Sequence, residues 1–265
     1  MTLKIGNIEV PTTATATFNG QSVNAIVFNG VTVWQKGSGL SRELELAKTP
    51  ILMHCDSAQW LNEGSATTTT YNFGTSAMTY QARAGFGAYV TRSFSNGSNY
   101  MDLGGLTLGS SDKYSVEAIC MLGMNGYAGD YAELVFSNSG GDLTPSATVT
   151  ATWRMRLTYN SATSATLTIG NDSTTVYTGT TGAITTTDKW YHLAATYNGN
   201  GTWTFFANGT LIGTYSFSGV STGFNFVFIN GGTSYDMGGW DEIVVHNYAR
   251  YTSSFTPQTQ PYTIA

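Results

Sequence analysis

Apolar and polar residues alternate in short runs along most of the chain, which is the pattern of strands with one buried face. The clearest run covers residues 114–122, where Val116, Ala118 and Cys120 fall on one face. Similar runs follow at intervals typical of a β-sandwich, at residues 133–137, 148–159, 165–169, 174–178, 190–197, 202–208, 210–215, 224–230 and 241–247. The pattern therefore predicts an all-β chain built from many short strands.

Asn-Gly pairs mark tight turns between several of these runs. The pair favours a type I′ hairpin turn because both of its residues adopt positive φ. One pair, at residues 208–209, separates two predicted strands, and two more, at residues 19–20 and 29–30, lie between short apolar runs near the N-terminus. Residues 1–36 therefore predict a small module of β-hairpins. Because so few strands bury little surface alone, we expect this module to complete its core against a partner chain.

A short segment of different character follows this module. Residues 37–39, Gly-Ser-Gly, predict a flexible joint. Ser41 is a candidate N-cap, and residues 42–48 predict a short helix that a Thr-Pro pair ends. We interpret residues 37–50 as a linker with a short helix, and residues 51–265 as one large domain.

The low content of charged residues narrows the classes of function. Only 10% of the 265 residues are charged, and the net charge is −5. Binding to nucleic acid or to an anionic membrane surface needs clustered Lys and Arg, and the sequence has no basic run, so we expect neither partner. The sequence also has no signal-like apolar core and no long apolar run, which predicts synthesis in a cytoplasm and no membrane insertion.

The two cysteines, Cys55 and Cys120, both lie in apolar segments that resemble strands. A cytoplasm keeps thiols reduced, which favours two buried free thiols. A disulfide between the two residues is the alternative.

Five strand motifs occur in an order that one family shares. They are Leu52-Met53-His54-Cys55-Asp56, Tyr114-Ser115-Val116-Glu117-Ala118, Trp190 to Tyr197, Phe205 to Gly213, and Trp240-Asp241-Glu242-Ile243-Val244-Val245. Together they resemble the laminin G-like jelly rolls of the concanavalin A-like lectin/glucanase type. One departure is Ile119, where the family often has Trp. The resemblance implies a jelly-roll β-sandwich of two antiparallel sheets over residues 51–265.

Two further segments resemble bacteriophage proteins. Residues 247–257, with the sequence NYARYTSSFTP, are similar to a strap in phage tail and virion versions of this fold. Residues 31–34, at the end of the hairpin module, resemble short β repeats of phage tail proteins. The resemblance implies a structural or host-adhesion protein of the virion, made in the host bacterial cytoplasm. Its hairpin module would bind other virion proteins, and its jelly roll would contact host surface glycans or neighbouring subunits in a homo-oligomer, with a trimer favoured.

The carboxylates give no pattern that indicates catalysis. Glycosidases need two carboxyl groups on one surface, and the hydrolases of this fold take them from an E-x-D-x-x-E run, which this sequence lacks. Glu117 is alone on its predicted strand, and Asp241 and Glu242 are neighbours that a regular strand points to opposite faces. We therefore predict that the protein is not an enzyme.

Other roles stay open on the sequence alone. The main alternative is a free bacterial carbohydrate-binding protein or an accessory domain for glycan degradation, which would need export. A purely structural decoration protein with no ligand is a further alternative, because this fold serves many functions.

A structural calcium ion is the one cofactor that the resemblance implies. Jelly rolls of this kind often hold Ca²⁺ beside the first and last strands, where a carboxylate and backbone carbonyls supply oxygen ligands. The matching residues are Asp56 and Asp241. A turn carboxylate with ordinary hydrogen bonds is the equal alternative for each. We expect His54, His192 and His246, which lie far apart in sequence, to be structural.

Exposed aromatic rings are the candidate ligand contacts, because a ring can stack on the C–H face of a sugar. Tyr127 and Tyr131 lie in a predicted loop with Gly126, Gly129 and Asp130. Trp203 is a third candidate. The alternative for each ring is a place in the core, since aromatic residues make up 13% of the chain.

Overall fold

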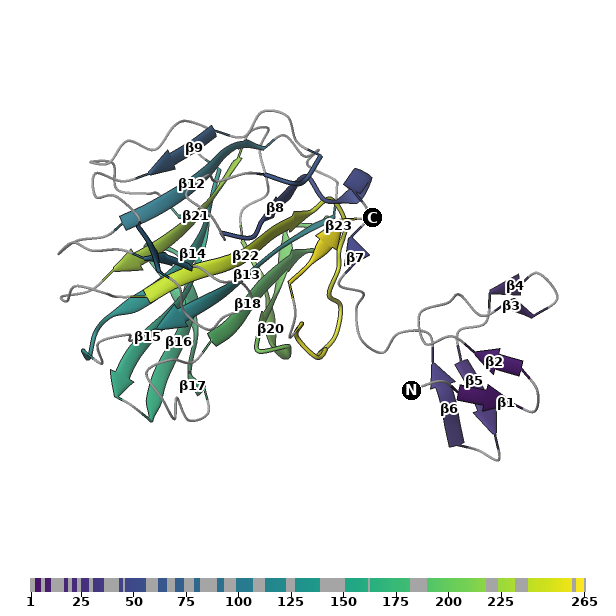
Figure 1. The fold of residues 1–265 in the computed structure, drawn as a ribbon. Helices are drawn as coiled ribbons and strands as arrows, with labels where there is room; N and C mark the ends of the chain where they lie inside the picture. Colours follow the sequence, from purple (N-terminus) through teal and green to yellow (C-terminus); the bar gives the residue numbers. More distant parts are fainter. Residues whose placement is uncertain are drawn as a thin grey trace. The chain divides into compact units, whose positions relative to one another are not determined.

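The chain forms two compact units in a computed structural model, Met1–Ser41 and Arg42–Ala265, which are taken one at a time below (Figure 1). The structure describes residues 3–5, 8–10, 17–18, 21–22, 25–28, 31–35, 43–44, 46–55, 62–65, 70–73, 79–81, 90–92, 99–106, 113–122, 127–138, 151–161, 163–181, 190–217, 224–231, 238–258 and 261–264. The predicted joint at residues 37–39 and the candidate N-cap Ser41 lie outside these ranges. Within the described residues, no helix is long and apolar enough to cross a membrane.

The first unit consists of short antiparallel pairs of strands. The strands are β1 (Leu3–Ile5) with β2 (Ile8–Val10), β3 (Thr17–Phe18) with β4 (Gln21–Ser22), and β5 (Ala25–Phe28) with β6 (Val31–Gln35). Strands β3 and β4 flank the Asn-Gly sequence at residues 19–20, and strands β5 and β6 flank the one at residues 29–30. This arrangement confirms the predicted hairpins.

The second unit is a sandwich of two antiparallel sheets, which confirms the predicted fold. Among the described residues, one sheet has eight strands in the order β10-β11-β22-β13-β18-β19-β20, with β8 also paired to β22. The other has seven strands in the order β17-β16-β15-β14-β21-β12-β9. The bounds in the first sheet are β8 (Ile51–Met53), β10 (Thr79–Gln81), β11 (Val90–Arg92), β13 (Tyr114–Leu122), β18 (Trp190–Tyr197), β19 (Thr202–Ala207), β20 (Thr210–Ser216) and β22 (Gly238–His246). Those in the second are β9 (Thr70–Phe73), β12 (Asn99–Leu106), β14 (Tyr131–Ser137), β15 (Trp153–Ser161), β16 (Ser164–Gly170), β17 (Thr175–Thr181) and β21 (Phe224–Gly231).

Aromatic side chains from both sheets fill the space between them. On β13 the residues of the predicted face, Val116, Ala118 and Cys120, point into this core. The ring centroids of Trp153 and Trp203 lie 4.9 Å apart, in an edge-to-face arrangement. Such pairs add to the stability that burial of their large apolar surface already provides.

Both cysteines are buried thiols with no disulfide between them, which confirms the favoured prediction for them. Cys120 lies on the core face of β13. Burial raises the pKa of its thiol, so the side chain stays protonated and unreactive.

The linker helix predicted over residues 42–48 is wrong. Glu43–Leu44 form strand β7, which pairs in parallel with β23 (Thr263–Ile264), and only Leu46–Lys48 form a single turn of 3₁₀-helix. A helix this short has little stability of its own, whereas Leu44 is 1% exposed in an apolar cluster against the sandwich. Residues 43–50 are therefore part of the second unit, not a spacer.

Residues 247–258 and 261–264, which we call the strap, follow β22 and run over the outer face of the first sheet. The backbone N–H of Phe255 donates to the carbonyl oxygen of Gly209 at 2.8 Å, and the N–H of Leu211 donates to Oγ of Ser254 at 3.0 Å. The rings of Tyr251 and Phe255 stack with centroids 3.8 Å apart. The strap therefore attaches to the hairpin between β19 and β20 as well as to the central strands.

Gly209 lies where this hairpin meets the strap, and Gly209→Ala is expected to lower the free energy of unfolding by about 2–3 kcal/mol. Its φ is 73°, which disfavours any side chain, and an added Cβ would meet the carbonyl oxygen of Phe255. The matched control is Gly201→Ala, because Gly201 has φ 78° but only the carbonyl oxygen of Phe217 nearby, at 3.7 Å. Urea unfolding of both variants measures the difference, and equal losses would show that the strap contact has no effect.

Candidate functional site

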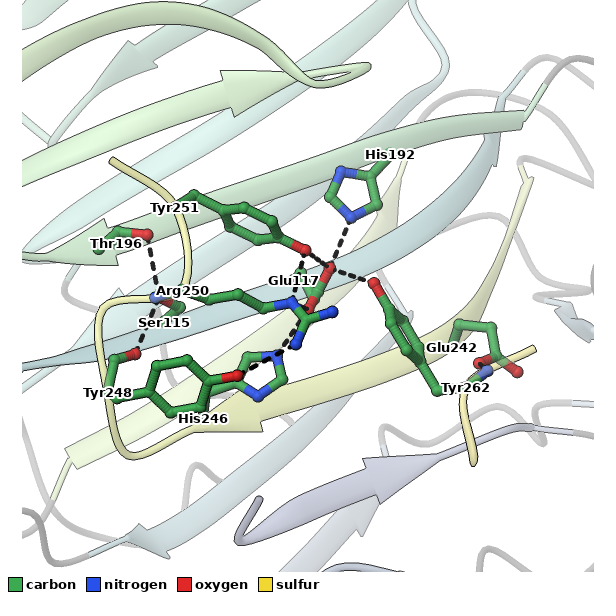
Figure 2. A network of polar contacts seen from close by, with 10 residues as sticks. All are labelled: Ser115, Glu117, His192, Thr196, Glu242, His246, Tyr248, Arg250, Tyr251 and Tyr262. Atoms are coloured by element: carbon green, nitrogen blue, oxygen red, sulfur yellow. Dashed lines mark hydrogen bonds and ion pairs between the residues drawn. The ribbon is translucent and has the colours of Figure 1, made fainter. Parts of the chain in front are cut away.

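A buried carboxylate lies at the centre of the outer face of the first sheet, beneath the strap. Glu117, in the middle of β13, is 0% exposed. Its Oε1 is 2.6 Å from Nε2 of His246 on β22, and its Oε2 is 2.7 Å from Nε2 of His192 on β18. β18 and β22 are the two neighbours of β13 in the sheet, which is why these imidazoles reach the same carboxylate (Figure 2).

The strap supplies the remaining contacts of Glu117. Nε of Arg250 is 3.3 Å from Oε1. The hydroxyl of Tyr262 donates to Oε2 at 2.6 Å, and the hydroxyl of Tyr251 donates to the same oxygen. We call Glu117 and its five partners, His192, His246, Arg250, Tyr251 and Tyr262, the Glu117 centre.

Burial and neighbouring groups set the protonation states of Glu117 and His246. Burial would raise the pKa of Glu117, but hydrogen bonds from His192 and His246 and the charge of Arg250 outweigh it and hold this pKa well below its usual value. Burial lowers the pKa of His246 against the opposing effect of Glu117, and Arg250 lowers it further. At neutral pH the carboxylate of Glu117 is therefore ionised beside the guanidinium of Arg250, and the imidazole of His246 is neutral.

The geometry of the Glu117 centre suits a structural role better than chemistry. Both carboxylate oxygens are already bound by donors, and the two imidazoles bind different oxygens. The guanidinium of Arg250 also stands beside Oε1, where it would repel a cation. Among the described residues, no group of three or more His, Cys, Asp or Glu side chains is placed to hold a metal ion.

The sequence predicts structural histidines, but it does not predict that His192 and His246 contact the same carboxylate, that of Glu117. Glu117 and His192 each have apolar neighbours in sequence. Each occupies one of the alternate strand positions that point away from the core. This alternation is a signal that could have placed them on the outer face. Strand order could not be obtained from the local pattern, because His192 and His246 are 75 and 129 residues from Glu117.

The residues predicted to bind calcium are only partly described. Asp241 is 0% exposed, and its Oδ1 accepts the backbone N–H of Glu242 at 2.8 Å. Asp56 lies outside the described residues, so the calcium pair stays a prediction. The regular alternation assumed for Asp241 and Glu242 does not hold, because the β13–β22 register shifts between the partners of Glu117 and Ile119, and Glu242 has φ 49°.

His54 lies apart from the Glu117 centre, at the end of β8. Its Nδ1 is 2.6 Å from Oε1 of Glu242, and its Nε2 is 3.5 Å from Oε2 of Glu63. Oε2 of Glu242 accepts the backbone N–H of Tyr262 at 2.8 Å. This carboxylate is therefore a second attachment point of the strap.

The predicted aromatic contacts lie in different environments. Tyr127, in the loop before β14, is 57% exposed. Tyr131, at the start of β14, is half-buried, with the guanidinium carbon of Arg156 4.0 Å from its ring centroid. The prediction that Trp203 contacts a ligand is wrong. Its ring is 0% exposed because it faces the core, 5.3 Å from the ring of Tyr114.

The outer face of the second sheet beside Tyr131 is polar and electrically balanced. Oε1 of buried Glu133 accepts from Nε of Arg156 at 2.8 Å, and Oε2 lies 3.3 Å from Nη1 of Arg154. Arg154 also pairs with Asp172. Two carboxylates thus offset two guanidinium groups, which leaves no excess charge among these four side chains.

Hydroxyl and amide groups extend this face across the next strands. Thr158 on β15 lies opposite Thr166 on β16 and next to Tyr131 on β14. Nδ2 of Asn160 donates to Oγ1 of Thr166 at 2.8 Å. The loop of Tyr127 is held to β15 because the N–H of Gly129 donates to the carbonyl oxygen of Tyr159 at 2.8 Å. We use the name Tyr127 surface for the loop residue Tyr127 together with the outer-face residues Tyr131, Arg156, Thr158, Asn160 and Thr166.

Comparison with solved structures found chains that are similar at low sequence identity. One similar solved structure is a carbohydrate esterase from the Shiga toxin-encoding bacteriophage phi24B, with 13% identity, a TM-score of 0.51, and coverage of 76% of this chain and 99% of that one. The binding domain of botulinum neurotoxin serotype D has 10% identity and a TM-score of 0.48, and that of Paraclostridial Mosquitocidal Protein 1 has 14% and 0.48. The alignments cover 76% and 77% of this chain but only 49% of each of those two chains.

The sequence comparison identifies the family. No curated protein matches the chain. The sequence profile of the concanavalin A-like lectin/glucanases superfamily matches residues 95–253, which is more than half of the chain. These residues include the strands that carry both the Glu117 centre and the Tyr127 surface. The chain therefore belongs to the concanavalin A-like lectin/glucanase superfamily.

Proposed function

We propose that the protein is a non-catalytic carbohydrate-binding component of a bacteriophage particle, and that it binds neutral glycans through the Tyr127 surface. The observation that carries the proposal is the exposed ring of Tyr127 in the loop that leads into β14, a strand whose outer face is polar and has no excess charge. An exposed ring can pack on the apolar face of a sugar, while nearby hydroxyl and amide groups exchange hydrogen bonds with its hydroxyls. Because the charges of Glu133, Arg154, Arg156 and Asp172 offset one another, a sugar without charge fits better than an acidic one.

The state of the buried carboxylates supports a non-catalytic role. Glycoside hydrolysis needs one carboxyl group free to donate a proton and a second that faces it across the substrate. Glu117 is covered by the strap and bound by donors on both oxygens, and Glu133 is 1% exposed and paired with two arginines. Neither carboxylate has the exposure or the open geometry that such a reaction needs.

The resemblance of the strap and of the hairpin module to phage proteins supports the place in a virion. The first unit consists of two-stranded pairs, which are marginal alone and gain stability by packing on another chain. We propose that this unit binds other virion proteins and that the protein forms a homo-oligomer, with a trimer favoured. Localisation on purified particles by electron microscopy tests this part, and absence from particles would favour the free bacterial carbohydrate-binding protein.

Tyr127→Ala is expected to weaken glycan binding about 3- to 10-fold, because it removes the exposed ring without disturbing the core. A panel of neutral and sialylated oligosaccharides identifies a ligand, and calorimetric titration then measures its affinity. Tyr127→Phe keeps the ring and should retain most of the affinity. Leu211→Ala, at a residue 42% exposed on β20 of the other sheet, is the control and should bind as the wild type does.

The charge balance gives the same experiment a second criterion. Affinity for a neutral glycan should change little with salt, since no net charge on the surface attracts the ligand. A preference for sialylated ligands, or equal affinity of the Tyr127→Ala variant and the wild type, would contradict the proposed site.

A further inference from the structure

Among the described residues of the sheet, Glu117 is the one that the most side chains of the strap contact. Three side chains of the strap, Arg250, Tyr251 and Tyr262, contact Glu117. Arg250 and Tyr251 lie near its start and Tyr262 near its end, so the loss of one acceptor would affect both parts. Further hydrogen bonds hold the strap: Oγ of Ser115 accepts the N–H of Arg250 at 2.9 Å, and Glu242, Gly209 and Leu211 bond the strap as described above.

Two histidines of the sheet contact this carboxylate. Nε2 of His192 and Nε2 of His246 both face Glu117. Nδ1 of each ring is buried and has no hydrogen-bond partner among the described residues. A proton added at Nδ1 of His246 would therefore be an unpaired buried donor, in a centre that already holds the guanidinium of Arg250.

We propose that the Glu117 centre is a pH-sensitive clamp, which holds the strap on the sandwich at neutral pH and releases it in acid. The groups that act on Glu117 come from every element packed against it. They are His192 from β18, His246 from β22, and Arg250, Tyr251 and Tyr262 from the strap. On β13 itself, the outer-face neighbours Ser115 and Ile119 carry no charge.

The direction of the effect follows from the difference between the closed and the open strap. With the strap closed, burial holds the pKa of His246 below its ordinary value. With the strap open, water reaches the ring, and the pKa returns towards about 6.5. Below that pH the open form binds a proton that the closed form does not, so acid favours opening.

Glu117 acts in the same direction at lower pH. Its pKa is held well below the ordinary value of 4.5 while the strap is closed. Once the strap opens, the carboxylate loses its donors and binds a proton more readily. The clamp is therefore fully effective above about pH 6.5 and weakens in two stages as the pH falls through the ordinary values of His and then of Glu.

Hydrogen exchange of the full chain, followed by mass spectrometry at pH 7.5 and 5.5, tests the clamp. After correction for the intrinsic pH dependence of exchange, peptides of the strap should exchange faster at pH 5.5 than at pH 7.5, by up to about tenfold, because the open form binds at most one more proton than the closed form over the unit of pH below 6.5. Peptides of β18, in the centre of the sheet, should keep their protection and show that the sandwich stays folded. Equal protection of the strap at both pH values would overturn the proposal.

Three variants locate the effect. His246→Gln keeps a hydrogen-bond donor but cannot bind the proton, so most of the pH-dependent change should disappear, whereas Glu63→Gln replaces an exposed carboxylate outside the centre and should retain it. Tyr262→Phe removes one donor to Glu117 and should raise strap exchange already at pH 7.5. A full pH response in His246→Gln, or an unchanged strap in Tyr262→Phe, would refute the clamp.

Discussion

Glu117→Ala is expected to lower the free energy of unfolding by about 3–5 kcal/mol, because it removes one partner of a buried ion pair and leaves the other without compensation. Arg250 would remain as a buried cation, and the hydroxyls of Tyr251 and Tyr262 would lose their acceptor. Each of these groups was desolvated when the strap closed. The loss therefore comes mainly from stranded polar groups and only slightly from lost packing.

Chemical unfolding at neutral pH measures this loss, and a surface carboxylate supplies the control. Glu63 has a side chain that is 55% exposed and lies 3.5 Å from His54, so Glu63→Ala should change stability by less than about 0.5 kcal/mol. If Glu117→Ala were as mild as Glu63→Ala, the Glu117 centre would not be what holds the strap on the sheet.

Strands of the two sheets differ in their sequence pattern of apolar and polar residues. On β15 and β16, buried and half-exposed residues alternate, because only one face of these strands is covered. On β13 every residue is buried, because the core covers one face, and on the other face the strap lies over Ser115 and Glu117 and Trp190 packs on Met121. Continuous burial gives a nearly continuous apolar run, in which a single polar residue such as Glu117 is easily taken as isolated.

This difference explains which parts of the candidate sites could be predicted. The sequence predicts the fold class, the hairpin turns and the core face of β13, since each depends on local pattern. It places Tyr127 and Tyr131 beside a turn for the same reason. The partners of Glu117 depend instead on strand order and on a strap that returns to the sheet, and both are set by packing over long sequence distances.

The linker shows how packing overrides local propensity. The sequence around Leu44 is compatible with a short helix, and it becomes a strand because β23 offers a partner and Leu52, Val244 and Tyr262 offer an apolar contact. Residues more than 200 positions away supply that partner. The local sequence around Leu44 does not contain this partner, so local propensity alone predicts the wrong element.

Trp203→Ala is expected to lower the free energy of unfolding by about 3–5 kcal/mol and to leave the glycan affinity of the folded protein unchanged. Strand β19 has apolar residues at both odd and even positions, so its sequence does not show which face of the sheet the tryptophan occupies. In the structure the ring packs between both sheets, with Phe136 at 4.8 Å and Tyr197 at 5.2 Å between ring centroids. Its removal leaves a large cavity in a core that cannot collapse around it.

Trp203→Phe separates packing from recognition, because a smaller ring fills part of the cavity and should recover part of the lost stability. Tyr127→Ala is the reciprocal variant, which should weaken binding while changing stability by less than about 0.5 kcal/mol. Thermal unfolding and calorimetric titration of both variants give the two readouts. A binding defect in folded Trp203→Phe would mean that the core ring shapes the ligand surface after all. A stability loss in Tyr127→Ala would mean that the exposed ring supports the fold.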